Sequence, residues 1–202
     1  MKNLLIVVIV TGFAAMAGSA LAAATVGKAA PDFTLSDLSG KTVRLADFKG
    51  RHVVLEWHNP NCPFVVKHYD SGNMPALQAR FDAKETVWLS INSTHPSHQD
   101  YMKADKLKRY LSDKGATPDA YLIDLEGNVG IEYAARTTPH MYVVNPSGTL
   151  VYAGAIDDKR STRLDDVKTA QNYLVAAVEE SRAGKPVSTS STSPYGCSIK
   201  YK

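Results

Sequence analysis

The sequence predicts an α/β fold in which helices flank a mixed central β-sheet and an N-terminal β-hairpin comes first. Two observations lead to this prediction. Apolar runs typical of strands alternate with segments of helical period, which favours parallel neighbours in the sheet. A hairpin signal at Asn145-Pro146-Ser147-Gly148 separates two late strands and adds an antiparallel pair to the same sheet.

The first half of the chain is predicted to form the hairpin, one central strand and two short helices. Residues 31–35 alternate apolar and polar side chains, and a turn at Ser39-Gly40 returns the chain into a strand over 42–45. Residues 52–57 are mostly apolar without strict alternation, which is typical of a strand covered on both faces. The helices are expected from Pro63 to about Tyr69 and, with Asn73 near the cap, from Pro75 to Ala83.

The second half is predicted to alternate strands with helices and to close on one long helix. Residues 86–92 read Thr-Val-Trp-Leu-Ser-Ile-Asn, the pattern of a strand, and Gly115 ends a charged amphipathic helix over 97–114. The shorter elements are strands over 120–123, 141–144 and 150–153 and a helix over 128–135. The closing helix spans 163–182, and its apolar face is formed by Val167, Ala170, Leu174, Ala177 and Val178.

The two ends of the chain are predicted to lie outside the domain. Residues 1–22 are expected to be a cleaved signal peptide, because Lys2 precedes an apolar stretch too short to span a bilayer and Ala20-Leu21-Ala22 matches a cleavage site. The protein is therefore expected to be periplasmic or secreted, without stable membrane insertion after cleavage. Residues 23–184 form the predicted domain, and residues 185–202 a flexible Ser/Thr-rich tail with no core to join.

The charge balance argues against one class of partner. The chain holds 23 Lys and Arg against 20 Asp and Glu, and removing Lys2 with the signal peptide leaves 22 against 20. This near-neutral total, without a basic run interleaved with aromatic residues, gives no basis for a nucleic-acid partner. The two cysteines, Cys62 and Cys197, allow one intramolecular pairing, which an oxidising compartment would let form.

The most informative motif is the turn around Cys62. A strand is expected to end at Trp57, and Pro63 follows Cys62 directly, in a position that suits the first turn of a helix. Unpaired backbone N–H groups and the positive end of the helix dipole converge at such a position, and both favour a thiolate. The motif therefore predicts a reactive thiol, and the alternative is a buried structural cysteine.

Four segments, taken in their order and spacing, resemble the thioredoxin-like superfamily. They are Ala30-Pro31-Asp32-Phe33-Thr34-Leu35, Asp47-Phe48-Lys49-Gly50, the strand-to-Cys62 turn and Arg136-Thr137-Thr138-Pro139. The branch is the redoxin and peroxiredoxin-like (AhpC/TSA-type) family with a single active-site cysteine, and the resemblance covers about residues 26–184. The resemblance implies a thioredoxin-like three-layer sandwich in which Cys62 is the nucleophile. It also implies that Pro139 is a cis-proline facing Cys62 and that main-chain groups of Thr138 are presented to a substrate chain. No organic cofactor is expected.

Three positions depart from better-known members of this superfamily. Val65 stands where thioredoxins have the second cysteine of Cys-x-x-Cys, so a local disulfide is impossible. Asn59 stands where typical peroxiredoxins have Thr or Ser three residues before their cysteine. Their peroxide-polarising arginine aligns with Pro139, and Arg136 is the nearby candidate. These departures count against efficient peroxidase activity.

Cys197 is the predicted partner of Cys62. Thirteen residues lead from Gly184 to Cys197, and a flexible chain of that length has a root-mean-square span of ~20 Å, against roughly 30 Å across a small domain. Cys197 could therefore resolve a sulfenic acid or a mixed disulfide at Cys62. Two alternatives stay open, a permanent structural Cys62–Cys197 disulfide and an unrelated free thiol at Cys197.

Residues beside the turn are candidates for supporting roles. Trp57 and Phe64 either belong to the core or form a wall that excludes water from the thiol. Glu56, an acid within an apolar strand, acts as a proton acceptor beneath the cysteine or reaches a lysine or solvent. A copper site is a weaker alternative, because the spacing matches no closed site. Its candidate ligands are His58, Cys62, His68, Met74, His140 and Cys197.

The leading hypothesis is an exported thiol-dependent oxidoreductase with an antioxidant role in cell redox homeostasis. Cys62 attacks a peroxide or a protein disulfide, Cys197 resolves the adduct, and an external dithiol reductant regenerates both thiols. The rivals are a non-enzymatic copper carrier or sensor and a thioredoxin-fold binding domain without the chemistry.

Overall fold

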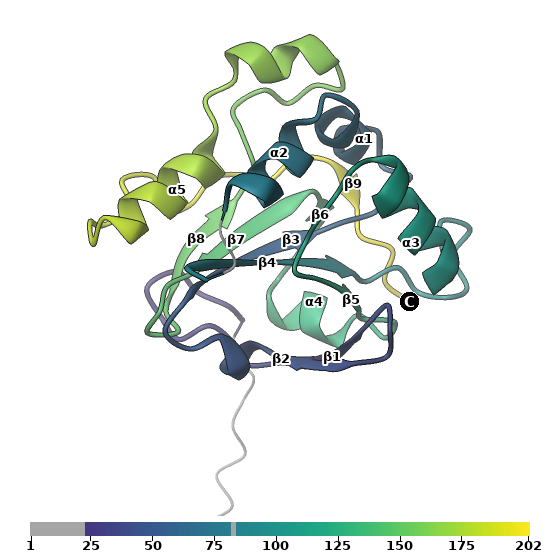
Figure 1. The fold of residues 1–202 in the computed structure, drawn as a ribbon, viewed down its shortest axis with the longest axis horizontal. Helices are drawn as coiled ribbons and strands as arrows, with labels where there is room; N and C mark the ends of the chain where they lie inside the picture. The colour runs from purple at the N-terminus through teal and green to yellow at the C-terminus, as the bar shows by residue number, and fades with distance from the viewer. Residues whose placement is uncertain (1–22, 82–83) are drawn as a thin grey trace, which may run out of the picture.

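The fold has three layers, with helices on both faces of one seven-stranded sheet (Figure 1). It is seen in a computed structural model that describes residues 23–81 and 84–202, so the predicted signal peptide over 1–22 lies outside the described residues. The layers confirm the predicted α/β fold, with a mixed sheet flanked by helices and an N-terminal hairpin.

Three parallel strands form the centre of the sheet. They are β3 (His52–Trp57), β4 (Thr86–Asn92) and β5 (Ala120–Ile123). Every residue of β3 and β4 is buried, as expected for strands covered on both faces. Because the parallel strands run in the same direction, the turn after β3 that carries Cys62 lies at the edge where β4 and β5 also end.

Antiparallel hairpins form both edges of the sheet. β7 (His140–Val144) and β8 (Leu150–Gly154) join beside β3, and β1 (Thr34–Asp37) and β2 (Thr42–Arg44) join beside β5. The order is β2-β1-β5-β4-β3-β7-β8. β1 begins three residues later than predicted and ends at Asp37. The end of β1 pairs with β5, and the Asp37 carboxylate then closes the turn by accepting the N–H of Ser39 at 2.8 Å.

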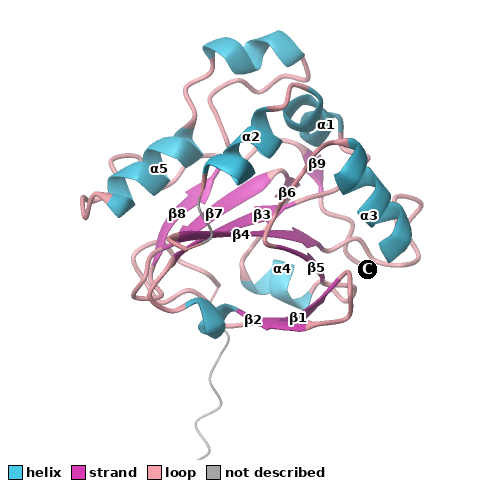
Figure 2. Ribbon diagram, in the orientation of Figure 1, coloured by secondary structure: helices cyan, strands magenta, loops and turns pink. Residues whose placement is uncertain are grey.

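The helices are divided unequally between the faces of the sheet (Figure 2). α1 (Pro63–Asp70), α2 (Asn73–Arg80), α3 (Ala104–Asp113) and α5 (Tyr173–Arg182) lie on one face, and α4 (Asn128–Glu132) lies on the other. Short 3-10 helices, η1 (Leu45–Phe48) and η2 (Leu164–Thr169), replace a predicted loop and the start of the predicted closing helix. Within the described residues, none of the helices is long and apolar enough to cross a membrane.

Three predicted helices are shorter in the structure. Residues 97–103 form a loop before α3, and Asp100 of that loop bonds to the turn before Cys62. The closing helix is divided because Asn172 pairs with Asp157 in an isolated bridge, and its side chain then caps α5 by accepting the N–H of Val175 at 2.9 Å. The helix predicted over 128–135 ends at Glu132.

The core has two parts because successive side chains of a strand point to opposite faces. Val53, Leu55 and Trp57 pack in the cluster that includes the α4 layer, whereas Val54 packs in the cluster with α1, α2 and α5. Cys62 belongs to this second cluster. The sulfur of Cys62 therefore lies on the side of the sheet where most of the helices pack.

The C-terminal tail packs on the domain, so the prediction that it has no core to join is wrong. Thr192 accepts a hydrogen bond from the backbone N–H of Ala155 at 2.8 Å, beside β8. Tyr195 is buried, and the hydroxyl of Tyr201 donates to the carbonyl of Ala135 at 2.9 Å. The aromatic side chains near the end of the chain thus anchor a segment whose composition is otherwise polar.

Candidate active site

Cys62 caps the N-terminus of α1, as the sequence predicts. The carbonyl of Asn59 accepts the N–H of Cys62 at 3.0 Å, and Pro63 occupies the first turn of the helix. The side-chain oxygen of Asn59 accepts the N–H of Asn61 at 2.9 Å, which closes the turn. Cys62 therefore occupies the N-cap position, next to the unpaired amide groups of the first turn, and its side chain makes no capping hydrogen bond to them.

The Cys62 side chain lies beneath the C-terminal tail and is only 1% exposed. Its thiol donates to the carbonyl of Thr138 at 2.9 Å, and the backbone N–H of Cys197 donates to Sγ of Cys62 at 3.4 Å. The Thr138–Pro139 peptide bond is cis, which confirms the predicted cis-proline. Both cysteines are free thiols, and they lie next to each other although most of the chain separates them in the sequence.

The tail reaches the sulfur as a short strand. β9 (Cys197–Ser198) pairs antiparallel with β6 (Thr137–Thr138), and Cys197 lies opposite Thr138. Gly196 precedes this strand with φ 139°, and a Cβ on it would overlap the carbonyl oxygen of Thr138. Glycine is therefore required at the position that brings Cys197 to Cys62.

Replacing Gly196 with alanine is expected to separate the tail from β6, since both the backbone angle and the overlap oppose a side chain there. The reduced variant should then react with iodoacetamide at Cys62 roughly tenfold faster or more, because alkylation follows local opening. Peptide mass analysis separates the two cysteines. Gly184→Ala is the matched control, because Gly184 also has positive φ but no neighbour within 4 Å of an added Cβ. Equal alkylation rates in both variants would contradict the packed strand.

Glu56 is a fully buried acid in the strand that leads to Cys62. Its carboxylate accepts hydrogen bonds from the hydroxyl of Tyr69 at 2.9 Å, the indole N–H of Trp88 at 2.9 Å and the hydroxyl of Ser90 at 2.8 Å. Burial raises the pKa of Glu56 to about 7, and these hydrogen bonds oppose the rise. The alternative that this acid reaches a lysine or solvent is wrong. Tyr69 belongs to α1 and links the acid to the helix that Cys62 begins.

The two aromatic residues predicted beside the thiol, Trp57 and Phe64, lie on opposite faces of the sheet. Trp57 is fully buried and packs against Tyr133 and Tyr142, at centroid distances of 5.4 and 5.1 Å, in the core cluster that does not contain Cys62. Phe64 contacts the ring of Tyr195 edge-on at 5.7 Å. Of these two aromatic residues, Phe64 is therefore the one that lies beside the tail.

The candidate metal ligands are engaged elsewhere. Nδ1 of His58 lies 2.8 Å from the hydroxyl of Tyr121, and Nδ1 of His68 lies 3.0 Å from the amide of Asn73. Burial lowers the pKa of each of these histidines to about 3, so both are neutral. Across residues 23–81 and 84–202, no three His, Cys, Asp or Glu side chains are grouped to hold a metal ion. Of the predicted copper ligands, Cys62 and Cys197 lie together, and no third histidine or cysteine of the described residues joins them.

Arg136 contributes to the loop through its backbone. Its N–H donates to Nδ1 of His140 at 3.3 Å, and its carbonyl accepts the N–H of Ile199 at 3.1 Å. The residue itself is exposed. Arg136 therefore supports the cis-proline loop and the docked tail, and its guanidinium group has no contact that would place it on the sulfur.

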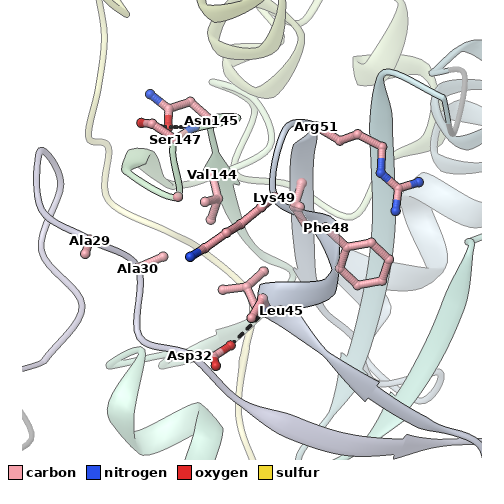
Figure 3. A pocket seen from close by; sticks show the side chains of 13 residues that line it. Ala29, Ala30, Asp32, Leu45, Phe48, Lys49, Arg51, Val144, Asn145 and Ser147 are labelled. Atoms are coloured by element: carbon pink, nitrogen blue, oxygen red, sulfur yellow. Dashed lines mark hydrogen bonds between the residues drawn. The ribbon is translucent and has the colours of Figure 1, made fainter.

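A separate cavity of about 260 Å³ lies away from Cys62 (Figure 3). It is lined by residues such as Leu45, Phe48, Lys49 and Val144, and Val53 at the start of β3 contributes to it. Cys62 follows the other end of β3, and four residue steps, roughly 13 Å along a strand, separate Val53 from Trp57. The residues that line this cavity do not include Thr138 or Cys197, which contact the Cys62 sulfur.

Two parts of the site were not predicted. The carboxylate of Asp100 accepts the amide of Asn59 at 3.1 Å and supports the turn before Cys62, from a loop that the sequence placed in a helix. Tyr195 anchors the tail two residues before Cys197. The signal for Tyr195 was its aromatic ring within an otherwise polar segment, which indicates burial.

Comparisons with known proteins agree with this geometry. The sequence profile of the AhpC/TSA family matches residues 26–153. Thiol-disulfide oxidoreductase ResA from Bacillus cereus is 30% identical over 124 residues, which are 56% of this chain and 72% of that protein. An uncharacterized conserved protein from Geobacillus kaustophilus superposes with a TM-score of 0.74 at 27% identity, covering 88% of this chain and 93% of that one.

A fourth comparison concerns the fold alone. The thioredoxin domain of a thiol-disulfide oxidoreductase from Bacteroides vulgatus superposes with a TM-score of 0.52 at 21% identity, covering 72% of this chain and 96% of that one. The mixed sheet, the cysteine at the start of α1 and the cis-proline opposite it fit the same architecture. The fold is thioredoxin-like, and the chain belongs to the AhpC/TSA family.

Proposed function

We propose that the protein is an exported thiol-disulfide oxidoreductase in which Cys62 is the nucleophile and Cys197 the resolving cysteine. The observation that carries this proposal is the N–H of Cys197 donating to Sγ of Cys62 at 3.4 Å, beside the cis Thr138–Pro139 bond. Relatives named thiol-disulfide oxidoreductase ResA support this class of reaction. Action in the periplasm or outside the cell rests on the signal peptide predicted over residues 1–22.

The reaction is two successive thiol–disulfide exchanges. The Cys62 thiolate attacks one sulfur of a substrate protein disulfide, that S–S bond breaks, and the other substrate sulfur leaves as a thiolate. The Cys197 thiolate then attacks the Cys62 sulfur, forms the Cys62–Cys197 bond and releases the remaining substrate sulfur. The substrate gains two electrons, and an external dithiol restores both thiols as it becomes a disulfide. The tail must move before the first attack, because Cys62 is buried beneath it.

The electrostatics favour this order of attack. The pKa of Cys197 is raised to about 12, first by burial and then by the hydrogen bond and the charge of Cys62. A mixed disulfide at Cys62 carries no charge, so the electrostatic contribution of Cys62 disappears once the first exchange has occurred. Cys197 therefore becomes easier to ionise at the stage at which it has to attack.

Disulfides are a better-supported substrate than peroxides. The polar contacts of the Cys62 sulfur in the described structure are the Thr138 carbonyl and the Cys197 amide, both from main chain. Main-chain groups of this kind suit an extended polypeptide, and the exposed Arg136 is not held against the sulfur. An antioxidant role would then follow from disulfide reduction.

Replacing Cys197 with serine is expected to trap the first intermediate, because no second thiol is present to resolve it. Incubation with a glutathionylated or disulfide-containing protein should give one stable mixed disulfide per chain at Cys62, identified by intact mass and peptide mapping. The wild-type chain should instead release the substrate thiol and gain an internal disulfide.

The outcome separates this function from its rivals. A Cys197→Ser chain that forms no mixed disulfide, even at excess substrate, would contradict the proposed nucleophile. A Cys62–Cys197 bond that excess dithiothreitol reduces only after unfolding would indicate a permanent structural disulfide instead. Faster oxidation of Cys62 by hydrogen peroxide than by a protein disulfide would reverse the assigned substrate.

A further inference from the structure

A buried polar cluster surrounds the hydroxyl of Tyr195, and the chemistry proposed above does not use it. Lys67 and His68 of α1 are fully buried, and Asp157, which follows β8, is 2% exposed. Nζ of Lys67 donates to the Tyr195 oxygen at 3.2 Å, and Nε2 of His68 lies 3.3 Å from the same oxygen. The Tyr195 hydroxyl in turn donates to the Asp157 carboxylate.

The phenol bridges the two buried charges of the cluster, each of which also bonds to the backbone of Lys159, at 2.8 Å from Lys67 and 2.9 Å from Asp157. Lys67 and Asp157 lie 3.8 Å apart, longer than a direct hydrogen bond, and the Tyr195 oxygen bonds to both. Burial lowers the pKa of Lys67, and the charge of Asp157 opposes that shift. His68 is neutral, because burial and the neighbouring Lys67 lower its pKa to about 3. Removing the hydroxyl would leave a buried cation and a buried anion without their shared partner.

The ring of Tyr195 is held as well as its hydroxyl. Phe64 contacts it edge-on at 5.7 Å, and Nζ of Lys67 lies 5.2 Å from its centroid. Tyr195 is followed by Gly196 and then by Cys197, so the anchor lies two residues from the resolving thiol. The strand that pairs with β6 is only two residues long, and pairing of that length is weak by itself.

We propose that Tyr195 is a positioning residue for the exchange reaction, and that Lys67, His68 and Asp157 form its docking site. The docked phenol holds the tail over Cys62 and thereby shields that sulfur from other reagents. It also keeps Cys197 beside Cys62, which raises the effective concentration of the resolving thiol. The second consequence rests on the proposed function, whereas the shielding of Cys62 does not.

The shielding is tested in the Cys197→Ser chain, in which Cys62 is the only thiol. Adding Tyr195→Ala is expected to raise the rate of alkylation of Cys62 by iodoacetamide roughly tenfold or more, because the tail opens more often. Tyr195→Phe keeps the ring and loses the hydroxyl, so it should give a smaller increase in the same direction. Rates within about twofold of the Cys197→Ser parent for both variants would overturn the proposal.

A matched control separates docking from a general loss of stability. Val43→Ala truncates a buried side chain in the other core cluster, far along the chain from the tail. Thermal unfolding measures the stability of each variant. Val43→Ala should leave the alkylation rate of Cys62 nearly unchanged, even where its loss of stability is comparable to that of Tyr195→Ala. Acceleration equal to that of Tyr195→Ala would overturn the proposal.

The positioning role is tested in chains that keep both cysteines. The effective concentration of Cys197 toward Cys62 is obtained from the equilibrium of the disulfide with reduced and oxidised glutathione, and Tyr195→Ala and Asp157→Asn should lower it roughly tenfold. An unchanged value in both variants would overturn positioning by Tyr195. Failure of the proposed function gives a different result. In that case the Cys197→Ser chain forms no mixed disulfide at Cys62, with or without a substitution of Tyr195.

Discussion

Cys62→Ser is expected to reduce the rate of disulfide reduction to the uncatalysed background, because serine at this position cannot act as a leaving or attacking sulfur. The loss should be at least about a thousandfold, as for removal of a nucleophile in other covalent mechanisms. Turnover is measured with a glutathionylated protein substrate and an excess of dithiol reductant. The fold should be retained, since the serine hydroxyl can still donate to the Thr138 carbonyl that now accepts the thiol.

The control for this experiment is the Cys197→Ser chain. In the same assay without dithiol reductant, that chain keeps the nucleophile, so it should consume one equivalent of substrate in a first rapid phase and then stop. Cys62→Ser should show no such phase. Full turnover by Cys62→Ser, with a native thermal transition, would reject Cys62 as the nucleophile, and no turnover by the wild type would favour a binding domain.

Glu56→Gln is expected to remove a large pH dependence of stability. The pKa of Glu56 is raised from 4.5 to about 7 by burial, so the folded state binds a proton that the unfolded state releases between these values. The contribution of this group to stability is therefore fully present below pH 4.5 and is lost as pH rises through 7. The shift corresponds to a change of about 3 kcal/mol in the free energy of unfolding.

The measurement is urea unfolding of the wild type and of Glu56→Gln at several values between pH 4 and pH 8. The difference between the two free energies of unfolding isolates Glu56, because the other titrating groups are common to both. That difference should change in favour of the variant as pH rises. A difference that stays constant within about 0.5 kcal/mol would show that Glu56 is not held protonated by its burial.

The strands and the active-site turn could be predicted because local signals agree with the tertiary structure there. The apolar run before Cys62 forms β3, and Pro63 begins α1. The cis bond at Pro139 followed from the family resemblance and is present. At β3 and at the start of α1, propensity, burial pattern and turn chemistry point to the same structure.

The packed tail and the divided helices could not be predicted, because their causes lie far away in the sequence. Tyr195 is buried because Phe64 packs against its ring and because Lys67 and Asp157 bond to its hydroxyl. The closing helix is divided where Asn172 pairs with Asp157. A composition rich in serine and threonine predicts a flexible tether. Composition alone does not predict that a single aromatic side chain is buried against residues distant in the sequence.

Peptide mapping of the wild-type chain after one turnover tests whether the docked tail presents Cys197 to Cys62. The reduced protein is mixed with one equivalent of a glutathionylated protein, quenched with acid at intervals and digested. We expect an early adduct on Cys62 that converts into a Cys62–Cys197 linkage at a rate independent of protein concentration. An adduct that persists, or a linkage that forms only between two chains, would contradict the idea that the docked tail presents Cys197 to Cys62.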